Sequence, residues 1–198
     1  MRRVVPWIVV LLLAARSAGQ TTRPVDAAWT RTVQQTATAI AGGDAVALAG
    51  MLSDDVAIRC VDGMDSRPAD ALRLLARLGR SRVVCALAYG GIPQHLAADI
   101  AEAIRDTDLP PETKELFALG DESHRRRANA TAAQWLSETL NAAPESPVGL
   151  ILLAPAEKTA PESSGAGGIV FVMLRGKGAL PACQVDVIAF GAPILNLK

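Results

Sequence analysis

Apolar residues at the start of the chain repeat first with the period of a helix and then with the period of a strand. The helical spacing is carried by four residues: Val25, Trp29, Val33 and Ile40. Gly42-Gly43 ends this helix, and Asp44 is placed to cap a short second helix that runs to Leu52. Alternation then indicates a strand, with three apolar residues on one face: Val56, Ile58 and Cys60.

The middle of the chain is mainly helical. A third helix is predicted at residues 67–78, where leucines lie on one face and charged residues on the other. The short apolar run at residues 82–89 lies between polar and glycine residues, which favours a strand. From residue 92 to 142, apolar residues return to helical spacing, and this predicts several helices in succession.

Three strand-like runs follow, at residues 148–154, 169–175 and 183–190. A polar, glycine-rich segment joins the first two, and Gly176-Lys177-Gly178 starts the connection to the third. Three successive strands of this kind predict an antiparallel meander. The middle run is apolar on both faces, so we expect it to be a central strand that is covered on both sides.

This order of elements resembles the nuclear transport factor 2-like (SnoaL-like) family, over residues 25–62 and again over the meander at 147–190. The resemblance implies an α+β fold in which N-terminal helices pack on a curved antiparallel sheet, forming a cone around a pocket. The block at about 92–142 departs from the family and is interpreted as a helical insertion; another α+β fold is the alternative. The family contains enzymes and binding proteins, so it does not decide whether this chain is an enzyme.

The first 19 residues have the composition of a secretory signal peptide. Arg2-Arg3 precedes an apolar stretch at residues 4–15, and small residues follow at 17–19. As a helix this stretch would rise only about 18 Å, whereas a hydrocarbon core is ~30 Å thick, so a membrane anchor is the less favoured alternative. We therefore expect an exported protein, periplasmic or secreted, in which residues 20–198 form a single domain with no stable membrane anchor.

Removal of the predicted signal peptide changes the charge of the chain. The whole sequence has 20 Lys and Arg residues and 20 Asp and Glu residues. Three arginines lie within residues 1–19, so the mature chain has 17 basic and 20 acidic residues and a net charge of −3. Nucleic acid binds proteins that neutralise its phosphates, and it is therefore not an expected partner.

Three cysteines, Cys60, Cys85 and Cys183, lie in apolar strand-like runs. An oxidising compartment would permit one disulfide among them, and the sequence does not select among the three pairings. Three buried free thiols are the other interpretation. The spacings match neither a zinc site nor a thioredoxin-like pair.

The sequence contains no motif for a metal or a phosphate group. His95 and His124 lie in polar parts of the helical block, and no HxH or HExxH spacing is present. The glycine-rich residues 163–168 precede a strand and lack the lysine of a phosphate-binding loop. Asn129 begins an Asn-Ala-Thr triplet that matches a glycosylation acceptor, but it falls within a predicted helix. We expect neither a metal nor a cofactor.

Two charged residues interrupt strands that are otherwise apolar. Asp186 lies in the last predicted strand, where simple alternation places it on the same face as Ile188 and Phe190. Arg59 lies in the first predicted strand. A charge in a half-buried strand is costly unless it is paired or faces water. These two residues therefore either face solvent or line a pocket.

If the cone encloses a pocket, Trp29 on the first helix should face the sheet near Phe171, Ile188 and Phe190. The strand alternation then places Asp186 at this pocket, with Arg59 as the nearest cation. The candidate ligand-binding residues are Trp29, Arg59, Asp186 and Phe190.

Two functions remain after these exclusions. The first is a non-enzymatic domain that binds a small apolar ligand or a protein partner, and the sequence is also compatible with a homodimer. The second is a hydrolyase or isomerase that uses Asp186 as its general base. Acid–base catalysis needs a second group to stabilise the developing charge, and no Tyr or His lies on the predicted sheet beside Asp186. The sequence therefore favours binding over catalysis.

Overall fold

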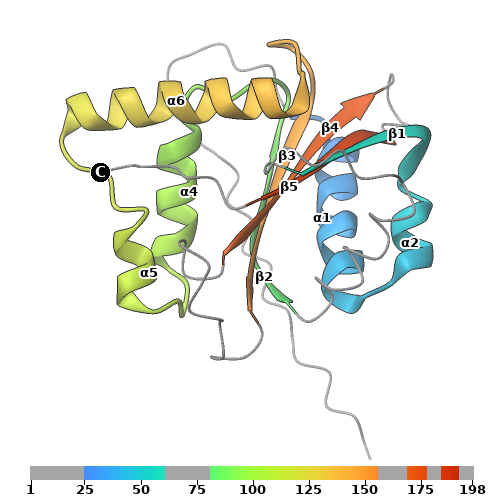
Figure 1. Ribbon diagram of the computed structural model, residues 1–198, viewed down its shortest axis with the longest axis horizontal. Coiled ribbons are helices and arrows are strands. Elements are labelled where there is room, and N and C mark those ends of the chain that lie inside the picture. The colour runs from blue at the N-terminus through green and yellow to red at the C-terminus, as the bar shows by residue number, and fades with distance from the viewer. Residues whose placement is uncertain (1–24, 61–80, 156–168, 178–183, 192–198) are drawn as a thin grey trace, which may run out of the picture.

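A computed structural model describes residues 25–60, 81–155, 169–177 and 184–191 of the chain. A curved five-stranded sheet lies between two groups of helices (Figure 1). The fold is therefore α+β, as the sequence predicts. The predicted signal peptide, the predicted third helix at 67–78 and Cys183 lie outside the described residues.

The helices and strands follow the predicted order. The N-terminal elements are α1 (Ala27–Gly42), α2 (Ala45–Ala49), β1 (Leu52–Cys60) and β2 (Ser81–Tyr89). The helical block consists of α4 (Leu96–Arg105), α5 (Pro111–Glu115) and α6 (Glu122–Leu140). The last strands are β3 (Val148–Pro155), β4 (Val170–Lys177) and β5 (Gln184–Gly191). Within the described residues, no helix is both long enough and apolar enough to cross a membrane.

Two aspartates begin the N-terminal helices. Asp26 caps α1 through a 2.6 Å hydrogen bond that its side chain accepts from the backbone N–H of Ala28. Gly43 ends α1 in the left-handed conformation (φ 63°), which glycine adopts without a steric penalty. Asp44 then accepts a 2.9 Å hydrogen bond from the N–H of Ala47 and caps α2. The predicted turn and cap are thus confirmed.

The strand order in the sheet is β1-β5-β4-β3-β2. Strands β2 to β5 pair in antiparallel fashion, which confirms the predicted meander and the central place of β4. The prediction of a wholly antiparallel sheet is wrong, because β1 is parallel to β5. Short connections force neighbouring strands to run in opposite directions, but β1 and β5 are separated by most of the chain and carry no such constraint.

Each face of the sheet has its own apolar core. The α1 core lies under α1 and α2, and its members include Trp29, Val33, Ile40, Leu48, Ile151, Leu174 and Ile188. The α6 core lies under the helices of residues 96–140, and its members include Leu96, Ile100, Leu136, Leu150, Phe171 and Met173. The helical block therefore forms the second layer of the sandwich, covering the sheet face opposite α1.

The two cores separate residues that were predicted to be neighbours. Trp29 faces the sheet, as predicted, and shares the α1 core with Ile188. Phe171 is instead in the α6 core, where its ring lies 6.1 Å from Phe117 and 6.2 Å from Trp135. The predicted contact between Trp29 and Phe171 is wrong, because successive residues of β4 point to opposite faces and both faces are covered.

Asn129 connects two helices of the second layer. Its side-chain oxygen accepts a 3.1 Å hydrogen bond from the backbone N–H of Ala98, in the first turn of α4. His95, at the N-cap position of α4, makes no capping bond with its own side chain. Asn129 therefore caps a helix other than its own. Because its side chain is buried and occupied, the Asn-Ala-Thr triplet is not an accessible glycosylation site.

Candidate functional site

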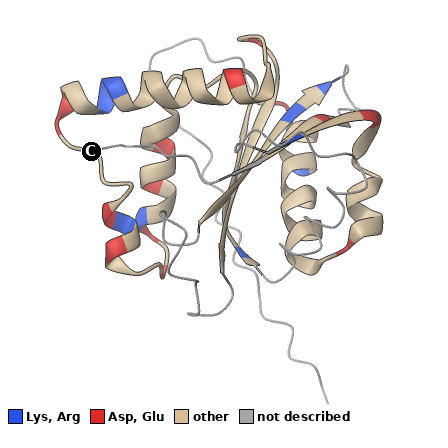
Figure 2. Cartoon of the chain, viewed as in Figure 1, with Lys and Arg blue, Asp and Glu red and all other residues tan. Residues whose placement is uncertain are grey.

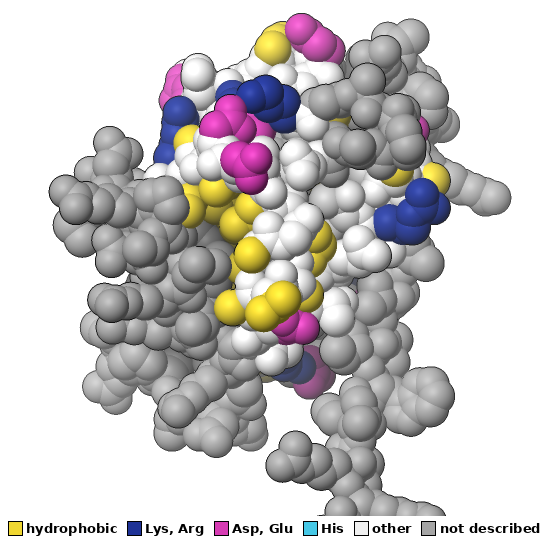
Figure 3. Space-filling view, turned by 90° about the vertical axis from the view of Figure 1, so that its right-hand side faces the viewer, with side chains coloured by type: hydrophobic (Ala, Val, Ile, Leu, Met, Phe, Trp, Pro, Cys, Tyr) yellow, Lys and Arg dark blue, Asp and Glu magenta, His cyan; other side chains and the backbone are white. Residues whose placement is uncertain are grey.

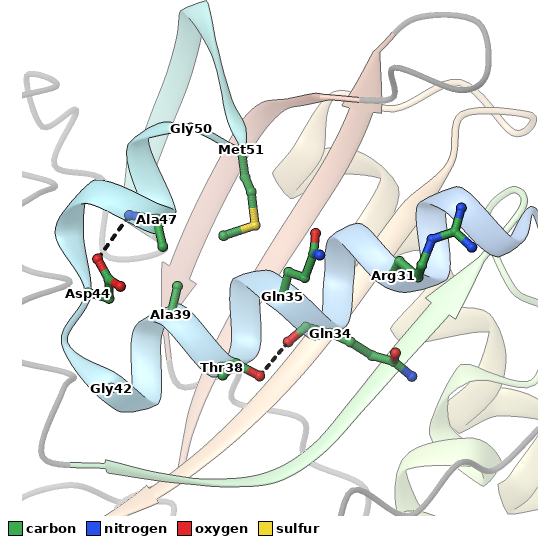
Figure 4. A pocket seen from close by; sticks show the side chains of 10 residues that line it. All are labelled: Arg31, Gln34, Gln35, Thr38, Ala39, Gly42, Asp44, Ala47, Gly50 and Met51. Carbon is green, nitrogen blue, oxygen red and sulfur yellow. Dashed lines mark hydrogen bonds between the residues drawn. The ribbon is translucent and has the colours of Figure 1, made fainter.

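An open groove lies between α1 and α2 and has a volume of about 800 Å³ (Figure 4). Its walls come from the exposed side of α1, from α2 and from the turn into β1. Ten residues line it: Arg31, Gln34, Gln35, Thr38, Ala39, Gly42, Asp44, Ala47, Gly50 and Met51.

The amphipathic pattern of α1 explains the polar wall of the groove. Trp29, Val33 and Ile40 are buried against the sheet, so the side chains between them must point away from it. Gln34, Gln35 and their polar neighbours on α1 therefore face the groove. Within the described part of the chain, the two glutamine amides make no hydrogen bond to another residue. They present free donors and acceptors to whatever enters the groove.

Small residues form most of the remaining lining. Ala39 and Ala47 face each other across the groove, and Gly42 and Gly50 lie where the helices end. A Cβ atom added at Gly42 would meet nothing within 4 Å, so the space beside it is open. The Met51 sulfur accepts a 3.5 Å hydrogen bond from the Thr36 hydroxyl and adds an apolar, adaptable surface.

Asp186 lies outside this groove and is held by an arginine. The Arg175 guanidinium donates to both oxygens of the Asp186 carboxylate, at 3.0 and 2.9 Å. The same guanidinium donates to the carbonyls of Leu140 and Asn141, at the end of α6. Arg59 donates to the Thr139 carbonyl, at 2.9 Å, and reaches the same helix end.

These contacts satisfy the C-terminus of α6. The last carbonyls of a helix have no partner within the helix and carry a partial negative charge. Arg59 and Arg175 supply hydrogen bonds and positive charge at this point, and Asp186 balances the charge of Arg175. The structure thus brings Arg59 and Asp186 to the same helix end. The arrangement favours a structural role for Asp186, because both of its oxygens are already engaged.

A bulge explains why the predicted face of Asp186 is wrong. The register between β4 and β5 shifts between the pairs Arg175–Val187 and Gly176–Val185, which leaves Asp186 as the extra residue. Val185 and Ile188 consequently share the α1 core, whereas Val187 lies in the α6 core. Asp186 joins Arg175 at the end of α6, on the side of the sheet away from Ile188. Simple alternation has no signal for such a bulge.

The other two predicted ligand-binding residues lie elsewhere. Trp29 is only 1% exposed, and its indole N–H donates to the Val148 carbonyl at 3.0 Å, which fixes α1 to β3. The backbone of Phe190 pairs with Cys60 and Val172 in the sheet. The Phe190 side chain lies outside the described parts of the structure. Of the predicted set, Trp29 therefore lies on the sheet face opposite to Arg59 and Asp186.

A tyrosine–carboxylate pair links the end of β2 to α4. The Tyr89 hydroxyl donates to Asp99 at 3.0 Å. Burial raises the pKa of Asp99, while the Tyr89 hydrogen bond and nearby His95 lower it and Glu102 raises it. Burial also raises the pKa of Tyr89 well above its usual value, and the charge of Asp99 adds to this. Sequence reasoning missed this pair, although Tyr89 is the sole tyrosine and Asp99 lies in the first turn of a helix.

The thiol of Cys85 is free and unreactive. Burial raises the pKa of Cys85 to about 12, so it is protonated at neutral pH and a poor nucleophile. The side chains of Cys60 and Cys183 lie outside the described residues, so the structure tests neither a disulfide between them nor a pair of free thiols. No group of three His, Cys, Asp or Glu side chains in the described ranges is arranged to hold a metal ion.

Comparison with known proteins assigns no family to the chain. The relation to the nuclear transport factor 2-like family therefore stays a prediction. No protein-family model, curated protein or solved structure matches the chain.

Proposed function

We propose that this chain is an exported, non-enzymatic binding domain that holds an extended segment of a partner protein in the groove between α1 and α2. The observation that carries this proposal is the lining of the groove. It combines the free side-chain amides of Gln34 and Gln35 with small residues and with open space beside Gly42. The predicted small apolar ligand is replaced here by a peptide, because the polar wall suits a polypeptide backbone better.

The two sides of the groove suit different parts of a peptide. Gln34 and Gln35 can each donate and accept, as a peptide backbone requires. The alanines and glycines opposite allow a chain to approach closely. Met51 offers an adaptable contact for an apolar side chain. Together these groups match the general pattern of peptide recognition, in which backbone hydrogen bonds give affinity and small apolar pockets give specificity.

An exposed apolar residue lies beside the groove. Val46 on α2 is 84% exposed and is the neighbour of Ala47, which lines the groove. Figure 3 views the side of the molecule that carries α1 and α2, and hydrophobic side chains gather there between charged groups. An apolar centre with a charged rim is the usual anatomy of a protein-binding surface.

The same lining argues against catalysis in the groove. It contains no His, Cys or Tyr, and its single carboxylate, Asp44, caps α2. An acid–base mechanism needs at least one further group within reach of a substrate. The alternative that uses Asp186 as a general base would first have to break the two bonds to Arg175. Binding is therefore the function that we prefer.

The architecture proposed with this function is that of the nuclear transport factor 2-like family. The succession of α1, α2 and β1, followed by the meander of β3 to β5, supports this relation. The layer formed by α4, α5 and α6 is its main departure. An experimental structure would test this relation: superposition of α1, α2, β1 and the meander on a nuclear transport factor 2-like domain would support it, and a different placement of these elements would contradict it.

A site-specific cross-linking experiment tests the groove. A photoreactive amino acid is placed at Gln35, and a matched control places it at Arg127, an exposed residue of α6. We expect a discrete adduct with one partner protein from position 35 and none from position 127. Equal labelling from both positions, or no adduct at position 35, would contradict the proposal.

A second pair of variants fills the groove without disturbing the fold. Gly42→Met places a side chain in the open space, whereas Ala49→Met adds the same bulk at an exposed residue of α2 outside the lining. We expect Gly42→Met to weaken partner binding by about tenfold or more, which corresponds to about 1.4 kcal/mol. Ala49→Met should bind like the wild type. Unaltered partner binding by Gly42→Met would exclude the groove as the binding site.

A further inference from the structure

The two helices that form the groove carry few charges. Arg31 is the single charged residue of α1, and α2 has none. Figure 2 shows mostly uncharged residues on these helices, and charges of both signs on α5 and α6. The solvent side of α1 instead presents neutral polar groups to the groove, namely Gln34, Gln35 and Thr38. A charged side chain in the lining is therefore an exception to the character of this surface.

Two charged residues line the groove, and they lie at its opposite ends. Of the ten lining residues, only Arg31 and Asp44 are charged. Arg31 lies near the start of α1, whereas Asp44 immediately precedes α2, beyond the end of α1 (Figure 4). All ten lining residues belong to residues 25–60, a range that the structure describes without a gap. The groove thus has a positive end and a negative end.

Both charges are available to a partner. Arg31 is exposed, and it makes no hydrogen bond or ion pair with another residue in the described part of the chain. Asp44 is also exposed; its Oδ1 atom accepts the Ala47 N–H that caps α2, and its Oδ2 atom has no partner among the described residues. On α6, by contrast, exposed Arg126 forms an ion pair with Glu122 of the same helix. The charges of the groove are therefore not balanced within the lining.

The separation of the two charges sets the length of chain that can reach both. Residues 31 to 42 of α1 rise by roughly 16 Å, at about 1.5 Å per residue. An extended chain advances about 3.3 Å per residue, so about five residues cover this length. A free amino acid or another small dipolar molecule is too short to contact both ends, whereas a peptide segment is long enough.

We propose that the partner segment carries an acidic side chain that binds Arg31 and a basic side chain that binds Asp44, with about four residues between them. This inference rests on the function proposed above, because it specifies the peptide that the groove holds. A guanidinium binds a carboxylate through two parallel hydrogen bonds, and the free Oδ2 atom of Asp44 accepts from a lysine or an arginine. A segment with the two charges exchanged would bring like charges together at both ends, so the groove selects against it.

Selection from a library of short random peptides displayed on phage tests this charge pattern. Arg31→Glu reverses the charge at one end, and Asp44→Asn removes the charge at the other while keeping a good helix cap. Arg127→Glu and Asp54→Asn are the matched controls, because they make the same changes at exposed positions outside the lining.

We expect the wild type and both controls to select peptides with an acidic and a basic residue about four residues apart. Arg31→Glu should select a basic residue in place of the acidic one, and Asp44→Asn should lose only the selection for the basic residue. A peptide selected on the wild type should bind Arg31→Glu at least about fivefold more weakly, which is the effect of losing one exposed ion pair.

Two results overturn the charge pattern but leave the proposed function standing. One is a set of selected peptides that fail to bind Gly42→Met yet share no acid–base spacing. The other is an unchanged spacing and charge order on Arg31→Glu. If no peptide binds the wild type more tightly than it binds Gly42→Met, both the charge pattern and the peptide-binding function of the groove are wrong.

Discussion

The Asp186 carboxylate and the end of α6 are connected through one side chain, Arg175. Arg175 binds both oxygens of Asp186 and two carbonyls of the last turn of α6. The Asp186 side chain is only 10% exposed and that of Arg175 is 22% exposed, so water screens this pair less than a surface pair. Removing one partner leaves the other charge partly buried and without its hydrogen bonds, and this lowers the free energy of unfolding.

We therefore expect Asp186→Asn to lower the free energy of unfolding by about 1–3 kcal/mol, as for other hydrogen bonds to charged groups. Urea unfolding at neutral pH measures this. Asp55→Asn is the matched control, because the pair between Asp55 and Lys177 is exposed to water and its loss should change the free energy of unfolding much less. If Asp186→Asn is as stable as the wild type but loses partner binding, Asp186 has a ligand role and the structural interpretation is wrong.

Asp99 should make stability depend on pH in the direction opposite to most aspartates. Burial raises its pKa in the folded state above the ordinary value of 3.8. The folded protein then binds the proton more tightly than the unfolded chain, so Asp99 contributes a stability that is present at low pH. That contribution is lost as the pH rises from about 3.8 through the raised pKa.

The test compares urea unfolding of the wild type and Asp99→Asn at a series of pH values from acidic to neutral. The stability of the wild type relative to Asp99→Asn should fall as the pH rises. Asp108→Asn is the control with the opposite sign, because the hydrogen bond from Arg82 lowers the pKa of Asp108. A relative stability of Asp99→Asn that does not change with pH would show that the carboxyl is not desolvated.

At the scale of elements, α1 lies unusually close to β3 at Gly149. A Cβ atom added at Gly149 would lie 2.6 Å from Cγ2 of Val33 and 3.3 Å from Cγ1. The absence of a side chain at this position therefore sets the distance between the helix and the sheet. Trp29, one turn earlier on α1, uses this closeness to donate to the Val148 carbonyl.

Gly149→Ala should lower the free energy of unfolding by about 1–3 kcal/mol, the usual cost of overpacking a core. Gly42→Ala is the matched control, since a Cβ atom there meets nothing within 4 Å and should cost no stability. Val33→Ala removes the two methyl groups that clash, so the double variant should lose less than the sum of the single losses. Additive losses in urea unfolding would show that this contact does not limit the approach of α1.

The elements that were predicted correctly depend on local physics. Asp44, Gly43 and the apolar stripe of α1 act within a few residues of each other, so sequence alone reveals the helices and the turn between them. The meander is similarly local, because successive strands are joined by nearby connections. The parallel pairing of β1 with β5 depends on chain segments far apart and has no such signal.

The candidate site was harder to predict than the fold. In the sequence, Arg31, Gln34, Gln35 and Thr38 look like the solvent face of an amphipathic helix, and α2 gives no sign that it lies beside them. The groove exists only because the turn at Gly43 brings the two helices together. Asp186, by contrast, was conspicuous in the sequence because it is a charged residue in an apolar strand. Its ion-pair partner Arg175 could not be predicted, because the bulge at Asp186 changes the face to which its side chain points.

At the scale of the whole molecule, the described domain is compatible with the predicted export. A protein that passes into an oxidising compartment risks unwanted reactions of free thiols, and these require the thiolate. Burial raises the pKa of Cys85 to about 12, which keeps this thiol protonated and unreactive. The N-terminal sequence, with Arg2-Arg3, an apolar stretch and small residues at 17–19, has the composition expected of an export signal.

We expect a bacterial host that secretes proteins to deliver the chain to its periplasm with residues 1–17 or 1–19 removed. N-terminal sequencing should then begin at Ala18 or Gln20. Leu12→Arg is the control, because a charge in the middle of the apolar stretch should block export and leave the precursor in the cytoplasm. Soluble cytoplasmic protein that retains Met1 in the wild type would contradict the export, while the groove, which lies within residues 31–51, would be unaffected.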